Sequence, residues 1–158
     1  MHVIYTPTAL DLPLFFNVDS SVGDGGDNSS SEDVMLVQFF LAIAGENLQG
    51  TPPPSGVSAI DWQSMIDLCV SLWSTGECDE ATIDAIRAFQ TAVHDNHPAI
   101  IVDGRVSVAR GFTYAPHAAW TIANMNFVIR THFPRIWPRL QDHPQCPGAL
   151  KTRFPKVL

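Results

Sequence analysis

The sequence predicts a mainly α-helical domain: a small orthogonal helical bundle with long loops and a short strand or extended segment at its N-terminus. Apolar residues recur at three- and four-residue spacings in four separate stretches, which is the period of an amphipathic helix. Apolar residues make up 46% of the 158 residues and charged residues 16%, which suffices for one core. Twelve prolines and ten glycines favour short elements joined by loops.

The N-terminal part predicts an extended segment and then a loop. Residues 1–17 mix apolar residues with two prolines and form a lead-in to the domain. Residues 19–32 are rich in Gly, Asp and Ser, and such clusters mark turns because Gly supplies positive φ and Asp and Ser bond to backbone donors. Ser30 or Ser31 is placed to cap the helix that follows, with two acidic residues in its first turn.

Four amphipathic stretches predict the helices of the bundle. They cover about 32–44, 58–73, 80–93 and 117–132. The second stripe predicts a core-facing set formed by Ile60, Met65, Ile66, Cys69, Val70 and Trp73. Proline-rich residues 45–56 predict a loop.

The link between the third and fourth helices predicts a strand and a tight turn. The Ala-Ile-Ile-Val run at 99–102 indicates a short strand, and Asp103-Gly104 a turn. Pro116 suits the first position of the last helix, where a missing N–H costs nothing.

Charge is distributed unevenly along the chain. The net charge is −7, which disfavours nucleic-acid binding because phosphate contacts need a positive surface. Through Gly104 there are fifteen acidic residues and one basic residue, and from Arg105 onward eight basic residues and one acidic residue. Either the basic part packs against the acidic body, or it is an interaction tail for an anionic partner.

A proline-punctuated tail, residues 133–158, repeats an aromatic-Pro-basic triplet. The triplets are Phe133-Pro134-Arg135, Trp137-Pro138-Arg139 and Phe154-Pro155-Lys156. Aromatic rings on rigid proline segments suit a partner's groove, because little entropy is lost on binding. The candidate partner-binding residues are Phe133, Arg135, Trp137, Arg139 and Phe154. The alternative is that these rings dock onto the chain's own bundle.

Three ordered motifs, within about residues 18–130, resemble the peptidoglycan-binding-like domain family. The motifs are a Gly-rich loop at 22–28 followed by Asp33-Val34-x-x-Val37-Gln38-x-x-Leu41, then Gly76-x5-Thr82-x-x-Ala85-Ile86-x-x-Phe89-Gln90, then Asp103-Gly104-Arg105-Val106 with Gly111 and Thr113. Two positions depart from the family pattern: Thr75 stands where Asp is usual, and Asp79 replaces a Gly.

This resemblance implies that residues 18–132 form a bundle of the peptidoglycan-binding type, a non-catalytic module that recognises bacterial cell-wall glycopeptide. The resemblance also implies an association with a wall hydrolase or with a contractile injection system. The candidate ligand-binding residues are Gly76, Gln90, Asp103, Gly104 and Arg105. The alternative is a structural or adaptor protein whose site has degenerated and whose tail docks a protein partner.

The sequence predicts no enzyme, metal site or cofactor. H-E-x-x-H, G-x-S-x-G, P-loop and C-x-x-C motifs are absent. His94 and His97 stand at a helix end without a second pair, and three irregularly spaced cysteines favour free thiols, with a Cys69–Cys78 bridge left open.

The sequence also predicts no membrane span and no Sec signal. No apolar run approaches the ~18 residues that a spanning helix needs. No Lys or Arg precedes the N-terminal apolar run. The expectation is synthesis in the bacterial cytoplasm, with any passage to the periplasm or envelope by a non-Sec route.

Overall fold

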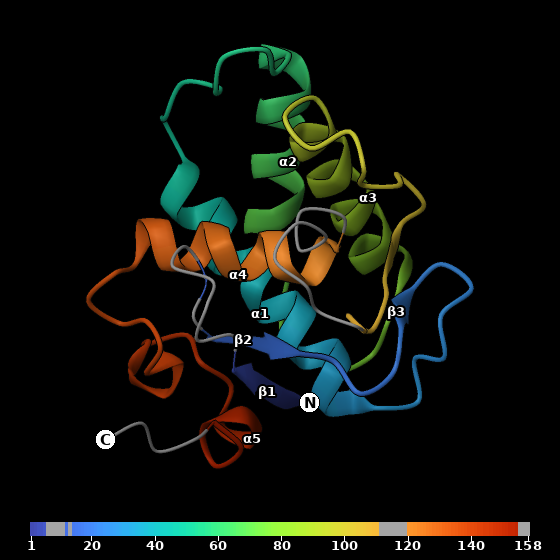
Figure 1. Ribbon diagram of the computed structural model, residues 1–158, viewed down its shortest axis with the longest axis vertical. Helices are drawn as coiled ribbons and strands as arrows, with labels where there is room; N and C mark the ends of the chain where they lie inside the picture. The colour runs from blue at the N-terminus through green and yellow to red at the C-terminus, as the bar shows by residue number, and fades with distance from the viewer. Residues whose placement is uncertain (6–11, 13, 111–119, 155–158) are drawn as a thin grey trace.

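The chain folds into a mainly helical bundle, which confirms the predicted class (Figure 1). The computed structural model describes residues 1–5, 12, 14–110 and 120–154. The helices are α1 (Ser31–Leu48), α2 (Ala59–Val70), α3 (Glu80–His94), α4 (Thr121–His132), the 3-10 turn η2 (Leu140–Asp142) and α5 (Gly148–Lys151). The strands are β1 (His2–Tyr5), β2 (Leu14–Asn17), β3 (Val22–Gly23) and β4 (Arg105–Val106).

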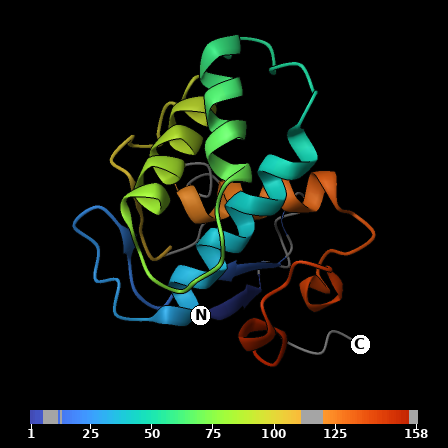
Figure 2. The same ribbon diagram turned by 180° about the vertical axis from the view of Figure 1, so that it is seen from behind.

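Helix α1 is the centre of the bundle. It packs against α2, α3, α4 and α5. Its residues are buried around most of its circumference, as expected of a helix covered on several sides. Helices α2 and α3 run side by side, and α4 runs across their direction (Figures 1 and 2). Ser30 caps α1, since its side chain accepts a hydrogen bond from Asp33 N at 3.2 Å, as predicted.

Helix α1 continues four residues beyond its predicted end, through Gly45 to Leu48. A glycine inside a helix usually costs stability. Here it allows a close approach, because a Cβ at Gly45 would lie 2.7 Å from Cys69 Cβ on α2. The loop predicted at 45–56 therefore begins later than expected.

The core-facing residues predicted for the second helix are partly wrong. Ile60, Val70 and Trp73 are 80%, 39% and 82% exposed instead of buried. The helix ends at Val70, so Trp73 lies beyond it. The stripe that faces the bundle consists of Trp62, Met65, Ile66 and Cys69, which follow the i, i+3, i+4, i+7 spacing. Ile60 and Val70 lie off this stripe.

The N-terminal segment forms a hairpin on the bundle. Strands β1 and β2 are antiparallel, with His2 opposite Asn17. Asn126 of α4 fastens β2, because its side chain accepts from Phe16 N at 2.7 Å and donates to Phe16 O at 2.8 Å. The buried amide thereby satisfies two main-chain groups of the hairpin.

The prediction of a strand at residues 99–102 is wrong. These residues form a turn and irregular backbone, with Ile101 72% exposed. The strand falls instead at Arg105–Val106, because there the chain meets β3 and pairs with it antiparallel. A run of β-branched residues without a partner strand satisfies no ladder hydrogen bonds.

The end of the chain adds a lobe to the same core. Leu140, Cys146, Leu150 and Phe154 are buried in the cluster that includes α1. Pro116 and the predicted start of the last helix at 117 lie outside the described residues, and the helix is described from Thr121. Within the described ranges, no helix has the length and apolarity that would allow it to cross a membrane.

Candidate functional site

The turn at Asp103–Arg105 is held by one buried side chain, Gln90 of α3. Gln90 Oε1 accepts hydrogen bonds from Asp103 N (3.1 Å) and Gly104 N (2.8 Å). Its Nε2 lies 3.0 Å from Asp103 Oδ1, 3.0 Å from Arg105 O and 3.1 Å from Thr121 Oγ1. We call this unit the Gln90 turn. It joins α3 to the start of α4 through a single amide.

The same arrangement occurs a second time, around Gln38 of α1. Gln38 Oε1 accepts from Gly76 N at 2.9 Å. Its Nε2 donates to Glu77 O (2.9 Å) and Thr82 Oγ1 (2.9 Å), and lies 3.3 Å from Thr75 Oγ1. We call this unit the Gln38 turn. It joins α1 to the start of α3.

The two units match at most positions, although Asp103 N bonds to its glutamine and the equivalent Thr75 N bonds to Trp73 O. Each has a positive-φ glycine at its centre, Gly76 (81°) or Gly104 (72°). In each, the residue after the glycine donates its N–H to the side chain before it, Glu77 N to Thr75 at 3.2 Å and Arg105 N to Asp103 at 2.9 Å. The structure therefore contains a repeated glutamine–turn–threonine unit.

A small pocket opens beside the Gln90 turn. Its volume is about 90 Å³, and its lining consists of Gln90, Ile101, Asp103, Arg105, Ser107, Trp120 and Thr121. Because a water occupies about 30 Å³ of liquid, this space suits a group of a few heavy atoms, such as a carboxylate or an acetamido group. The side chains of Asp103 and Arg105 are 31% and 41% exposed, with Arg105 Nη2 3.6 Å from Asp103 Oδ2.

The pocket combines an ionic and an apolar surface. The Arg105 guanidinium offers a planar donor set for a carboxylate. The half-buried Trp120 adds an aromatic side chain to the lining. Three of the predicted ligand-binding residues line this pocket: Gln90, Asp103 and Arg105. Gly104 lies between the last two in the turn, and its N–H donates to Gln90.

Gly76 does not join this pocket. It lies in the Gln38 turn, is buried, and packs against α1. A Cβ at Gly76 would lie 2.4 Å from Ser31 Oγ, so the glycine itself packs on α1, whereas the flanking Thr75 and Glu77 are exposed. The structure thus separates Gly76 from the other predicted ligand-binding residues.

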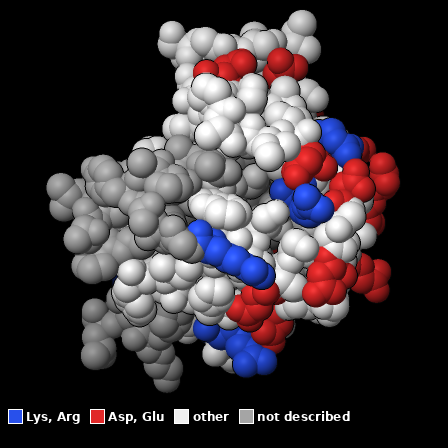
Figure 3. All heavy atoms as spheres, turned by 45° about the vertical axis from the view of Figure 1, so that its right-hand side comes forward, with Lys and Arg blue, Asp and Glu red and all other residues white. Residues whose placement is uncertain are grey.

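The Gly-rich loop packs directly on the Gln90 turn. Asp24 N donates to Gly104 O at 3.0 Å. Gly23 has φ 115°, and a Cβ there would lie 2.1 Å from Gly104 O, so only glycine allows this contact. Arg87 pairs with Asp24 at 3.1 Å. Acidic side chains predominate on this side of the molecule, with basic side chains between them (Figure 3).

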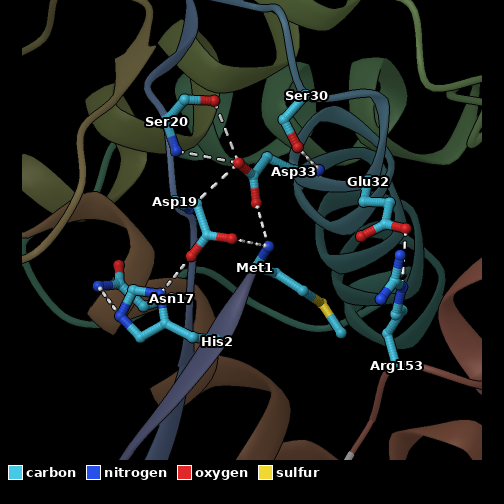
Figure 4. Close-up of polar contacts among 9 residues, drawn as sticks. All are labelled: Met1, His2, Asn17, Asp19, Ser20, Ser30, Glu32, Asp33 and Arg153. Carbon is cyan, nitrogen blue, oxygen red and sulfur yellow. Dashed lines mark hydrogen bonds and ion pairs between the residues drawn. The ribbon is translucent and has the colours of Figure 1, made fainter.

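A buried carboxylate anchors the N-terminal segment to α1 (Figure 4). Asp33 is fully buried, and its Oδ2 accepts from Asp19 N (3.1 Å), Ser20 N (2.9 Å) and Ser20 Oγ (3.1 Å). Its Oδ1 lies 2.9 Å from the amino group of Met1. Burial lowers the pKa of this amino group, but hydrogen bonds to Asp19 and Asp33 outweigh it and raise the pKa. The sequence indicated only a helix-dipole role for Asp33.

The aromatic rings of the tail pack on the chain itself. The ring of Phe16 makes edge contacts with Trp137 (5.3 Å between centroids) and Phe154 (5.0 Å). Phe133 contacts the buried His143 at 5.4 Å. Of the two arrangements that the sequence left open, the structure contains intramolecular docking for these rings.

The basic residues of the tail differ in their surroundings. Arg135 and Arg139 are exposed, and Arg139 Nε lies 3.5 Å from Asp142 within the tail. Arg153 instead reaches the body, where its Nε donates to Glu32 Oε1 at 2.8 Å (Figure 4). At this point the basic end of the chain packs against the acidic part.

The cysteines are free thiols, so the Cys69–Cys78 bridge is not formed. Burial raises the pKa of Cys69 to about 12 and that of Cys146 to about 11, despite an opposing effect of Lys151 on Cys146. Both are protonated at neutral pH and therefore poor nucleophiles. Burial also raises the pKa of Cys78. Among the described residues, no three His, Cys, Asp or Glu side chains are grouped so as to hold a metal ion.

Comparisons of the chain with models of protein families, with curated proteins and with solved structures give no match.

Proposed function

We propose that the chain is a non-catalytic module that binds bacterial peptidoglycan through the pocket beside the Gln90 turn. The observation that carries the proposal is the meeting of Arg105, Asp103 and Trp120 around a small opening held in place by Gln90. The motif resemblance supports the same ligand, because the Gln90 turn combines residues of two of its three motifs, Gln90 of the second and Asp103-Gly104-Arg105 of the third.

The chemistry of the pocket fits a cell-wall glycopeptide. Stem peptides present carboxylates, for which the Arg105 guanidinium is a suitable partner. Amino sugars present acetamido groups and apolar ring faces, which suit a short polar pocket beside the indole of Trp120. Asp103 and Ser107 supply acceptors and a hydroxyl for the remaining polar groups.

Co-sedimentation with washed sacculi tests the proposal, with released muropeptides followed in the same tube. We expect the full chain to sediment with the sacculi and to release no muropeptides. Arg105→Ala should reduce retention by roughly tenfold or more, because a charge-assisted contact contributes about 1.5–3 kcal/mol. Muropeptide release by the purified chain would contradict a non-catalytic role.

The Gln38 turn supplies matched controls. Glu77→Ala changes the residue equivalent to Arg105, and Thr75→Ala removes the same turn hydrogen bond that Asp103→Ala removes. Retention should fall for the changes at Arg105 and Asp103 and stay unchanged for those at Glu77 and Thr75. Equal retention of all four variants would rule out the pocket as the ligand site.

A further inference from the structure

Among the described residues, the most exposed large apolar side chain lies at a groove that shares no lining residue with the Gln90 pocket. Trp73 is 82% exposed and follows the end of α2. The groove beside it has a volume of about 540 Å³ and lies between α1, residues 70–74 and residues 145–147. Its apolar walls are formed by Phe39, Ala42, Val70, Leu72, Trp73 and Pro147.

We propose that this groove binds a segment of a protein partner in which a Lys or Arg stands beside an apolar side chain. The proposal is independent of peptidoglycan binding, because the two sites have no residue in common.

The exposure of Trp73 favours a macromolecule over a small ligand. A small molecule that filled the groove would leave most of the outward-facing indole in water. A protein segment lying across the groove covers both the walls and the ring. Tryptophan is one of the residue types enriched among those that dominate the binding energy of protein interfaces.

The charge of the groove selects a cationic segment. Glu46 is the charged residue of the lining, is exposed, and forms no ion pair within the described part of the chain. Burial lowers the pKa of the nearby His143 in spite of the opposing effect of Glu46, so this imidazole does not neutralise the carboxylate at neutral pH. The lining contains no Lys or Arg that would attract an anionic lipid surface or nucleic acid. A Lys or Arg beside an apolar anchor complements Glu46 and the apolar walls.

The tail contributes to this groove as a wall. Gln145 and Pro147 line it, and the neighbouring Cys146 is buried. The aromatic rings of the tail pack on the chain itself. The tail would therefore contribute to partner binding by completing the groove beside Trp73, and the partner would supply the basic residue.

Selection of random displayed peptides against the full chain tests the proposal. Peptides that place Lys or Arg near an aromatic or aliphatic residue should be enriched. Their affinity should fall roughly tenfold or more for Trp73→Ser, the size of effect typical of an interface anchor. Ile60→Ser is the matched control, since Ile60 is 80% exposed on α2, the helix that precedes Trp73, and does not line the groove, and it should not change the affinity.

Charge reversal tests the cationic part of the inference. Glu46→Lys should weaken the selected peptides several-fold, whereas Asp67→Lys, an exposed carboxylate of α2 outside the groove, should not. The proposal is overturned if no peptide is enriched, or if enriched peptides lack basic residues or bind Trp73→Ser as tightly as the unchanged chain. It is also overturned if the chain forms a concentration-dependent dimer that Trp73→Ser dissociates, because the occupant would then be a second copy.

Discussion

The Gln38 turn and the Gln90 turn share most of their hydrogen-bond pattern but differ in their surroundings. A Cβ on Gly76 would meet Ser31 Oγ at 2.4 Å and Met35 Cε at 3.1 Å, so α1 packs on the glycine of the first turn. The Gln90 turn borders a pocket of about 90 Å³. The pattern itself serves to join a helix to the start of a later helix. What makes one turn a candidate site is the space left beside it.

The helix that follows each turn also begins differently. Asp79 caps α3, since its carboxylate accepts from Thr82 N at 2.9 Å and Thr82 Oγ1 at 2.7 Å. At α4 the N-cap position is Trp120, which has no side-chain cap hydrogen bond. The stretch from Gly104 to Thr121 is also longer than that from Gly76 to Thr82. The first turn is followed closely by a helix whose N-cap side chain forms hydrogen bonds. After the second turn, Trp120 occupies the N-cap position of α4 and lines the pocket without capping the helix.

The largest difference between the turns is expected on replacing their glycines. Gly76→Ala should destabilise the fold by about 3 kcal/mol or more, because positive φ is strained for Ala and the Cβ collides with Ser31. Gly104→Ala should cost about 1–2 kcal/mol, since its nearest neighbour at 3.0 Å is the movable end of Arg87. Urea unfolding followed by circular dichroism measures both. Equal losses would mean that the two turns are equally enclosed.

Replacement of the two glutamines separates folding from binding. Gln38→Ala and Gln90→Ala should each cost roughly 2 kcal/mol, because each leaves buried main-chain groups without partners. At a temperature where both variants remain folded, retention on sacculi should fall only for Gln90→Ala. A parallel loss in both variants would show that retention reports stability alone.

The acidic cap of α3 predicts a smaller, pH-dependent effect. Asp79→Ala should cost about 1 kcal/mol. Hydrogen bonds from the Thr82 side chain and backbone lower the pKa of Asp79 below its ordinary value of 3.8. Its contribution is therefore present above pH 3.8 and disappears as the pH falls through the lowered value. Thermal unfolding from pH 7 to 3 should show the difference between Asp79→Ala and the unchanged chain shrinking with acid. A pH-independent difference would contradict this assignment.

Placing a capping side chain at the start of α4 should give the smallest change in stability. Trp120→Asn places a good N-cap residue at the start of α4 and removes the half-buried indole, and these opposing effects should leave stability within about 1 kcal/mol. Retention on sacculi should nevertheless be lost with the aromatic wall. Full retention would remove Trp120 from the site and confine the ligand contacts to Asp103 and Arg105.

Sequence periodicity predicted the helices well where one face is consistently apolar. The stripe through Ile86 and Phe89 and the Ser30 cap both appear as expected. Periodicity failed for α2, because Ile60, Val70 and Trp73 are apolar yet lie off the packed stripe. The presence of an apolar residue in the sequence does not show which neighbours will cover it in the folded chain.

The candidate site was predictable only in part. Asp103 and Arg105 were identified through their motif, and the structure places them beside Gln90. Trp120 was not among the predicted ligand-binding residues, yet it is half-buried against the core and also lines the pocket. Its position depends on where α4 begins relative to a turn at Gly104, and no local spacing encodes that.

The sequence by itself determined the elements of this protein: the helical periods, the serine cap, the glycine turns and the concentration of acidic residues before Gly104. These depend on residues close together along the chain. The tertiary structure alone decided which of the two turns borders the small pocket, which aromatic rings are buried and that Trp73 lies at a groove. Those outcomes depend on contacts between distant segments, whose geometry is set by the packing of whole helices.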